Sequence, residues 1–334
     1  MRVSDKSGSV IESHGKEFAV DSTYRHASAG FITHAHSDHI KILKTVDFPY
    51  YMSPLTKEIL GEEYKGTKSL DKPLKFDETT VSLHSAGHIG GSSQVHFADG
   101  INLVVTGDMK MEDDLLVKGA EPLKCDTLVI ESTFGRPEYV FPKRETVYEE
   151  MSAWCKANLD AGASVILAGY SVGKAQELNA FVNQYLGDVP IVHPKIAKVN
   201  EAYNNHGFKL DYLDSSTKEA RDAGRDARIF LLPPHLVDLH TISAMSTSYD
   251  KRFVSAFATG WSVRGASGKY NKAFPLSSHA HFPDLVKYVE ASGAKKVYTQ
   301  YGYAREFAAF LRKKGVDARP LNESNQQSLA DFCD

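Results

Sequence analysis

The sequence of 334 residues predicts the α/β fold class. Apolar runs such as 164–168 have the length and composition of buried strands. Amphipathic segments follow them, and in one of these Val147, Met151 and Trp154 share a helical face. A cluster of side chains that can bind a metal comes directly after the strand-like run 30–33, which indicates a site at the end of a strand.

Composition sets limits on the class of protein. The chain is long enough for two domains, and its 42% hydrophobic and 24% charged residues are typical of soluble proteins. A net charge of −3 argues against a basic coat for nucleic acid but leaves room for a local basic groove. Three scattered cysteines indicate a reducing cytoplasmic protein, without a disulfide framework or a cysteine zinc site. Residues 1–6 are not a signal peptide, no apolar run is long enough to cross a membrane, and the oligomeric state stays open.

The first part of the chain predicts short strands joined by turns. A hairpin is expected over residues 9–21, around Gly15. Ser53 and Pro54 have the residue types of a helix N-cap and first helical position. Further strands are expected at 81–83, 93–97 and 101–105, the last two joined by a tight Asp99-Gly100 turn.

Helices and strands alternate in the rest of the chain. The run 125–131 predicts a buried strand that ends in an acid, Glu131. The remaining predicted elements are strands at 164–168, 229–232, 253–257 and 296–299, a helix carrying Leu178, Val182 and Tyr185, a helix from Asp284, and a last helix closed by Gly315.

The most informative stretch is Thr33-His34-Ala35-His36-Ser37-Asp38-His39. Alternation on an extended strand would put His34 and His36 on one side, where both imidazoles reach the same ion. Asp38 and His39 follow as the chain leaves the strand, so we expect them to face a second ion. Imidazole and carboxylate ligands suit zinc first and other first-row metals next. A histidine-rich surface loop is the alternative interpretation, and so dense a group of ligands disfavours it.

This stretch resembles the HxHxDH signature of the metallo-β-lactamase fold, and other segments match that family's pattern in order. Asp21 matches the early aspartate, His88 the third histidine and Asp108 the bridging aspartate. The resemblance implies one zinc ion on His34, His36 and His88 with Asp108 bridging, and a second on Asp38, His39 and Asp108. Asp21 would orient a ligand histidine.

Two further segments resemble the β-CASP branch, the nucleic-acid-cutting members of this fold. Glu131-Ser132-Thr133-Phe134-Gly135 resembles its motif A, and Ser277-Ser278-His279-Ala280 its motif B. The implied architecture is an αββα sandwich formed by residues 1–135 and 275–334, with an α/β β-CASP domain inserted at 136–274. The segments look most similar to ligase-associated DNA exonucleases and to archaeal mRNA 3′-end processing factor-like proteins.

The resemblance also implies roles for individual residues. Asp38, Glu131 and His279 would be catalytic, with His279 held protonated by Glu131 and donating a proton to the leaving 3′ oxygen. A purely structural Glu131 and His279 are the alternative. In a cleft between the domains, Ser278, Lys174 and Arg264 are the candidates for binding substrate phosphate.

One position departs from the family. RNA-cutting β-CASP members carry a motif C histidine before a glycine, and Tyr301 stands there in this chain, before Gly302. A phenol is a poor zinc ligand at neutral pH, so we expect one tight zinc site and a second, weaker one. Mn²⁺ is the alternative ion.

These observations predict a zinc-dependent nuclease, and a DNA exonuclease in repair is the preferred form. An RNA-processing exo- or endoribonuclease is the alternative. A small-molecule metallohydrolase would not need the inserted domain, and a non-catalytic scaffold would not need the complete ligand set. The expected partner is single-stranded DNA or RNA, with a DNA ligase or repair proteins as further candidates.

Overall fold

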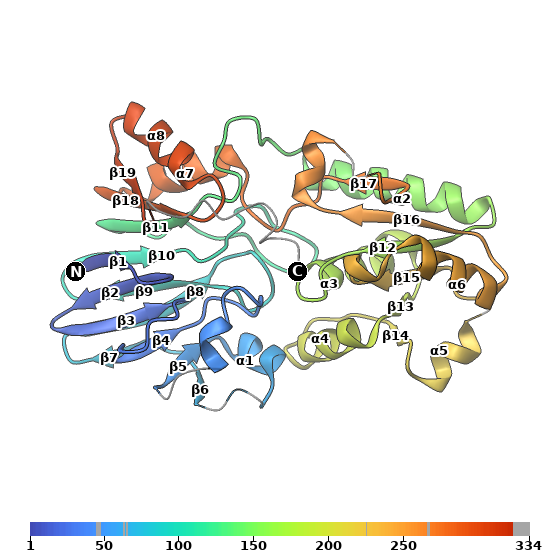
Figure 1. Ribbon diagram of the computed structural model, residues 1–334, viewed down its shortest axis with the longest axis horizontal. Coiled ribbons are helices and arrows are strands. Elements are labelled where there is room, and N and C mark those ends of the chain that lie inside the picture. Colours follow the sequence, from blue (N-terminus) through green and yellow to red (C-terminus); the bar gives the residue numbers. More distant parts are fainter. Residues whose placement is uncertain (45–47, 63, 65, 225, 266–267, 323–334) are drawn as a thin grey trace. The chain divides into compact units, whose positions relative to one another are not determined.

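The chain divides into two units, whose helices and strands are drawn in Figure 1. The computed structural model describes residues 1–44, 48–62, 64, 66–224, 226–265 and 268–322. Unit 1 comprises Met1–Asp113, Val117–Val140 and the chain from His279, and unit 2 comprises Asp114–Leu116 and Phe141–Ser278. The α/β class predicted from the sequence is confirmed by these mixed elements.

Unit 1 contains two sheets. The first has the order β1-β2-β3-β4-β5-β6, from Arg2–Asp5, Ser9–Ser13, Lys16–Val20, Ala29–Phe31, Tyr50–Met52 and Thr67–Ser69. The second has the order β19-β18-β11-β10-β9-β8-β7, from Asp317–Pro320, Lys296–Gln300, Thr127–Glu131, Asn102–Val105, Ser93–Ala98, Thr79–Ser85 and Leu74–Phe76. Strands β10, β11, β18 and β19 run parallel, so the carboxyl ends of β10, β11 and β18 lie at one edge of the sheet.

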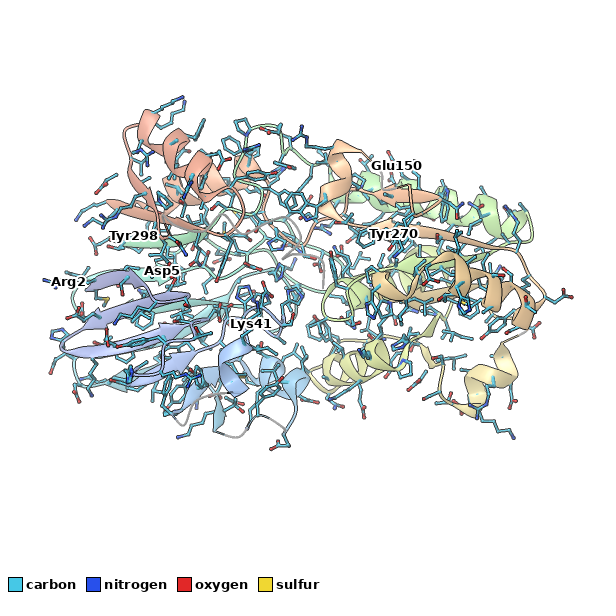
Figure 2. The ribbon with its side chains drawn as sticks, in the orientation of Figure 1. Arg2, Asp5, Lys41, Glu150, Tyr270 and Tyr298 are labelled. Atoms are coloured by element: carbon cyan, nitrogen blue, oxygen red, sulfur yellow. The ribbon has the colours of Figure 1, made fainter. Side chains whose placement is uncertain are left out.

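Apolar side chains from both sheets of unit 1 form a shared core. Phe18 and Phe31 of the first sheet pack with Phe97 of the second, at centroid distances between 5.6 and 6.4 Å. Tyr298 of β18, labelled in Figure 2, belongs to the same core. Helices α7 (Phe282–Ser292) and α8 (Ala304–Lys313) cover the other face of the second sheet. The helix α1 (Pro54–Leu60) begins as predicted, because Ser53 Oγ accepts a hydrogen bond from the backbone N–H of Thr56.

Unit 2 is a parallel sheet with helices on both faces. Its order is β14-β13-β15-β12-β16-β17, from Leu213–Asp214, Ile191–Val192, Ile229–Leu232, Ser164–Ala168, Phe253–Ala258 and Lys272–Phe274. One face packs against α2 (Arg144–Asp160), α3 (Lys174–Phe181) and α4 (Pro194–Asn205). The other face packs against α5 (Lys218–Ala223) and α6 (Leu239–Tyr249). Within the described ranges, no helix has the length and apolar character needed to span a membrane.

Candidate metal centre

The histidine-rich stretch forms a loop that follows β4. The strand ends at Phe31, so strand alternation is not what brings His34 and His36 together, and that part of the sequence-based explanation is wrong. The loop is held by Asp21, whose carboxylate accepts hydrogen bonds from Thr33 N (2.8 Å) and Thr33 Oγ1 (2.5 Å). A turn then forms in which His39 N donates to His36 O. The loop therefore bends so that its side chains are directed toward one position.

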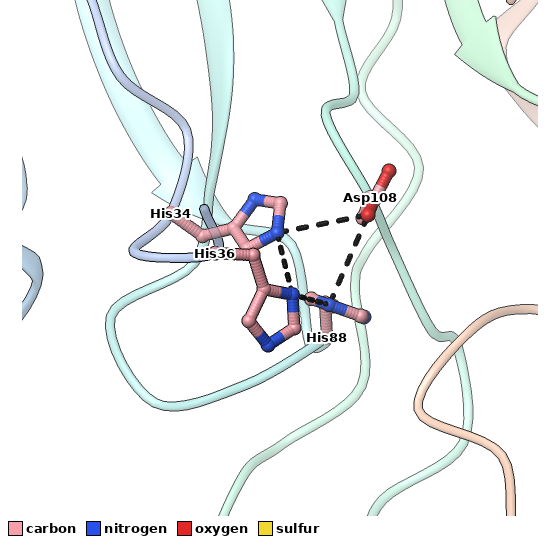
Figure 3. Close-up of side chains that lie close together, drawn as sticks. All are labelled: His34, His36, His88 and Asp108. Carbon is pink, nitrogen blue, oxygen red and sulfur yellow. Dashed lines mark hydrogen bonds and ion pairs between the residues drawn. The ribbon is translucent and has the colours of Figure 1, made fainter. Parts of the chain in front are cut away.

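Four side chains converge at that point, as Figure 3 shows. His36 Nδ1 lies 3.0 Å from His34 Nε2 and 3.2 Å from His88 Nε2. Asp108 Oδ2 lies 3.6 Å from His34 Nε2 and 3.9 Å from His88 Nε2. The structure thus brings together the residues that the sequence assigned to the first ion.

This donor set fits a tetrahedral metal ion. Zinc–nitrogen bonds of about 2.0–2.1 Å imply donor atoms roughly 3.3 Å apart, close to the spacings observed here. Burial lowers the pKa of His34, and the neighbouring His39 and His36 lower it further, so its imidazole is neutral, as a ligand must be. Three imidazole nitrogens and one carboxylate oxygen match the preferences of a first-row divalent ion.

Asp108 reaches the cluster because two backbone segments approach each other closely. It follows β10 through Gly107, whose φ is +57°. A Cβ added at Gly107 would lie 2.7 Å from Cβ of Thr33, in the metal-binding loop. Only glycine allows both this conformation and this contact. His88 is fixed in the β8–β9 connection, where its N–H and that of Ile89 donate to Ser92 Oγ.

Around His39 lie the residues predicted for a second ion. His39 Nε2 is 3.4 Å from Asp38 Oδ2 and 3.4 Å from Asp108 Oδ2. Its other nitrogen, Nδ1, is 2.7 Å from Asp21 Oδ2. The ring of Tyr301, a residue with φ +62°, lies 5.4 Å from the His39 ring. Asp38, His39 and Tyr301 also line a cavity of about 440 Å³ in unit 1.

Glu131 and His279 contact each other next to Asp108. Both carboxylate oxygens of Glu131 are 3.1 Å from His279 Nδ1, and Met109 N donates to Oε1 at 2.6 Å. Burial lowers the pKa of His279, but Glu131 and Asp108 outweigh it and raise the pKa to about 9. Asp108, Glu131 and His279 also have ligand atoms within 4.8 Å of one another, so they form a second group that could hold a metal.

The three candidates for phosphate binding differ in their surroundings. Ser278 is half-buried directly before His279, and Arg264 is exposed at the end of the 3₁₀ helix Gly260–Arg264. Lys174 is buried, and its Nζ donates to Glu177 Oε2 at 2.6 Å. Lys174 is thus bonded to a carboxylate within unit 2, and its contact to substrate phosphate stays a prediction.

Sequence reasoning missed the residues that surround Lys174. Arg144, Tyr148 and Glu177 all lie on helices of unit 2 and are buried with it. The only available signal was the i,i+3 spacing of Lys174 and Glu177, which also occurs on solvated helix surfaces.

Comparison with known proteins finds several relatives of this chain. It is 30% identical over 316 residues to a probable DNA ligase of Opitutus terrae, covering 90% of this chain and 29% of that protein. It is 29% identical to the transcription termination factor FttA of Methanothermobacter thermautotrophicus, covering 62% of this chain and 38% of that protein. An RNase J-like protein of Methanocaldococcus jannaschii is 27% identical, with coverages of 49% and 46%.

The chain spans less than half the length of each of these relatives. No protein-family model matches the chain. A crystal structure of an Enterococcus faecalis protein of unknown function aligns with a TM-score of 0.52 and 14% identity, covering 81% of this chain and 74% of that one. That likeness concerns the fold alone.

Proposed function

We propose that the chain is a member of the β-CASP branch of the metallo-β-lactamase fold and a zinc-dependent nuclease that hydrolyses phosphodiester bonds of nucleic acid. The observation that carries the proposal is the convergence of His34, His36, His88 and Asp108 beside the Glu131–His279 pair. Unit 1 is then the αββα metallo-β-lactamase domain, predicted at residues 1–135 and 275–334. Unit 2 is the inserted β-CASP domain, predicted at 136–274.

The two ion positions would share one donor and otherwise use different ones. His34, His36 and His88 would hold the tighter zinc ion, with Asp108 shared between the two positions. Asp38 and His39 would complete the weaker position, and Mn²⁺ is the alternative ion there. A bound ion supplies Lewis-acid chemistry, because it acidifies water and offsets the negative charge of the transition state. Asp21 would fix the ring of His39 through its Nδ1.

His279 would act as the general acid. Hydrolysis adds one water to the phosphorus atom and breaks the P–O3′ bond, which leaves a phosphate monoester and a 3′ hydroxyl. The departing 3′ oxygen needs a proton, and His279 Nε2 would donate it while Nδ1 stays bonded to Glu131. Ser278, Arg264 and Lys174 remain candidates for contacts to substrate phosphate.

Single-stranded DNA is the substrate we propose, with exonucleolytic cleavage in repair. The match that covers 90% of the chain lies in a probable DNA ligase, which favours DNA and makes a ligase a candidate partner. RNA processing is the second candidate, because other relatives are a transcription termination factor and an RNase J-like protein.

The test is a comparison of end-labelled single-stranded DNA and RNA, each incubated with protein of measured zinc content. We expect DNA to be shortened, the activity to disappear after chelation and zinc to restore it. His88→Ala should abolish both the bound zinc and the cleavage, whereas His206→Ala, an exposed histidine at the end of α4, should change neither. Faster RNA cleavage would favour the second candidate. No cleavage of either polymer by zinc-loaded protein would refute the nuclease assignment.

A further inference from the structure

A buried ion cluster in unit 2 centres on the carboxylate of Glu177. Arg144 Nη1 and Tyr148 OH both donate to its Oε1, the tyrosine at 2.6 Å, and Lys174 Nζ donates to its Oε2 at 2.6 Å. All four residues are at most 4% exposed. Three donors on one carboxylate compensate Glu177 fully within a region that excludes water.

A gain in stability does not by itself explain such a buried cluster. Buried ion pairs cost desolvation energy, and replacing them with apolar residues is often neutral or stabilising. Their best-supported advantage is that they fix one geometry among several.

Arg144 connects the cluster to the segment that precedes His279. Its Nη2 donates to the backbone carbonyl of Ser277, while its Nη1 is held by Glu177. The planar guanidinium therefore sets the position of this carbonyl relative to helices α2 and α3. Two residues later the chain reaches His279, and then Ala280 N donates to Met109 O at 2.7 Å. The chain on each side of His279 is thus held by a hydrogen bond within its own unit, at Ser277 in unit 2 and at Ala280 in unit 1.

We propose that Arg144, held by Glu177, is a positioning residue that fixes the backbone before His279 and so keeps this imidazole aligned with Glu131 and the reacting phosphate. The proposal rests on the proposed nuclease function only for its kinetic consequence. A misplacement of about 1 Å in a reacting group can cost on the order of 100-fold in rate, so a distant anchor is enough to matter.

The test uses Arg144→Lys, which keeps the charge but lacks the planar guanidinium fork that holds Glu177 and Ser277 in a fixed geometry. Glu177→Gln is the second variant and keeps the shape of the side chain. With natural DNA we expect kcat to fall by at least about 10-fold, with KM and zinc content unchanged. With a thymidine 5′-(p-nitrophenyl) phosphate, whose leaving group needs no proton, we expect less than about a threefold loss. In a His279→Ala background, Arg144→Lys should have no further effect on DNA cleavage.

Tyr148→Phe is the matched control, because it removes a donor from the same carboxylate without touching Ser277. It should lower thermal stability but leave the dependence on the leaving group unchanged. Equal losses on both substrates in Arg144→Lys and Glu177→Gln, or losses additive with His279→Ala, would overturn the proposal.

A measurement without substrate tests the positioning of His279 independently of the nuclease assignment. The Nδ1 proton of His279, identified by its absence in His279→Ala, should give a downfield proton signal in the metal-free protein. That signal should shift or broaden in Arg144→Lys and stay in place in Tyr148→Phe. An unchanged signal in Arg144→Lys would refute positioning even if the protein is a nuclease, and a shifted signal in an inactive protein would leave positioning intact.

Discussion

His39 Nδ1 lies 2.7 Å from Asp21 Oδ2, and the same carboxylate also accepts hydrogen bonds from the N–H and hydroxyl of Thr33. Asp21 therefore ties the start of the metal-binding loop to its last histidine. The residue itself has a positive φ of +45°, which aspartate tolerates better than most side chains. One side chain thus sets both the course of the loop and the orientation of an imidazole.

Asp21→Asn should weaken metal binding, because an amide cannot accept from Thr33 and His39 with the strength of a carboxylate. Loss of such a partner typically lowers metal affinity about 10–100-fold, and the ion at His39 should be the more affected. Zinc titration followed by calorimetry measures this. Asp77→Asn is the matched control, since Asp77 also has a positive φ but forms an exposed ion pair with Lys16. Equal zinc affinities in both variants would show that Asp21 serves the loop alone.

His279→Ala should lose most hydrolysis while the zinc at His34, His36 and His88 stays bound. Removing a general acid costs about 10²–10⁴-fold in rate. Metal analysis and cleavage rates should be measured on the same preparation. His281→Ala is the control, because this neighbouring histidine lies 3.5 Å from Asp284 at the start of α7. If zinc content collapses in His279→Ala, then His279 is chiefly a ligand, as its proximity to Asp108 and Glu131 would allow.

Gly107→Ala should destabilise the protein and reduce its zinc content together. An alanine at φ +57° costs ~1–2 kcal/mol in backbone strain. The contact with Thr33 adds an overpacking cost on the order of 1–3 kcal/mol. Gly162→Ala separates these effects, because Gly162 also has a positive φ but a Cβ there would meet open space. Denaturant unfolding and metal analysis of both variants decide the matter. A Gly107→Ala protein that keeps its zinc would mean that the close approach to Thr33 does not position Asp108.

The fold was predictable where local signals and tertiary packing agree. The β2–β3 hairpin around Gly15 and the strand Ser164–Ala168 lie where the sequence predicts them. The helix predicted from Asp284 begins at Phe282, because Pro283 occupies its first turn and acts as the start signal. The edge strands β1 and β19 are short and polar, so the sequence carries no periodic signal for them.

The candidate site also combines residues whose surroundings could be predicted from the sequence with residues whose surroundings could not. The ligands of the first ion could be predicted because they concentrate in short sequence segments. The structure brings His34, His36, His88 and Asp108 together. The environment of Lys174 could not be predicted, because the spacing of Lys174 and Glu177 does not reveal that Arg144, 30 residues away in the sequence, is buried with them on the same carboxylate. Local sequence does not distinguish a lysine that is exposed to solvent from one that is bonded to a buried carboxylate.

Tyr301 provides the last prediction, because it stands where a ligand histidine would complete the second ion position. A phenol with a pKa near ~10 is a poor zinc ligand at neutral pH, so calorimetric titration should show one tight and one weaker zinc site. In Tyr301→His the second site should bind more tightly, since imidazole supplies a nitrogen beside His39, whose ring lies 5.4 Å away. Histidine also tolerates the positive φ of this position. Tyr301→Phe, which keeps the ring and adds no ligand, should bind zinc as the unaltered protein does. Two equally tight sites in the unaltered protein would mean that another residue supplies the missing ligand, and the assignment of the second site to Asp38, His39 and Asp108 would then be wrong.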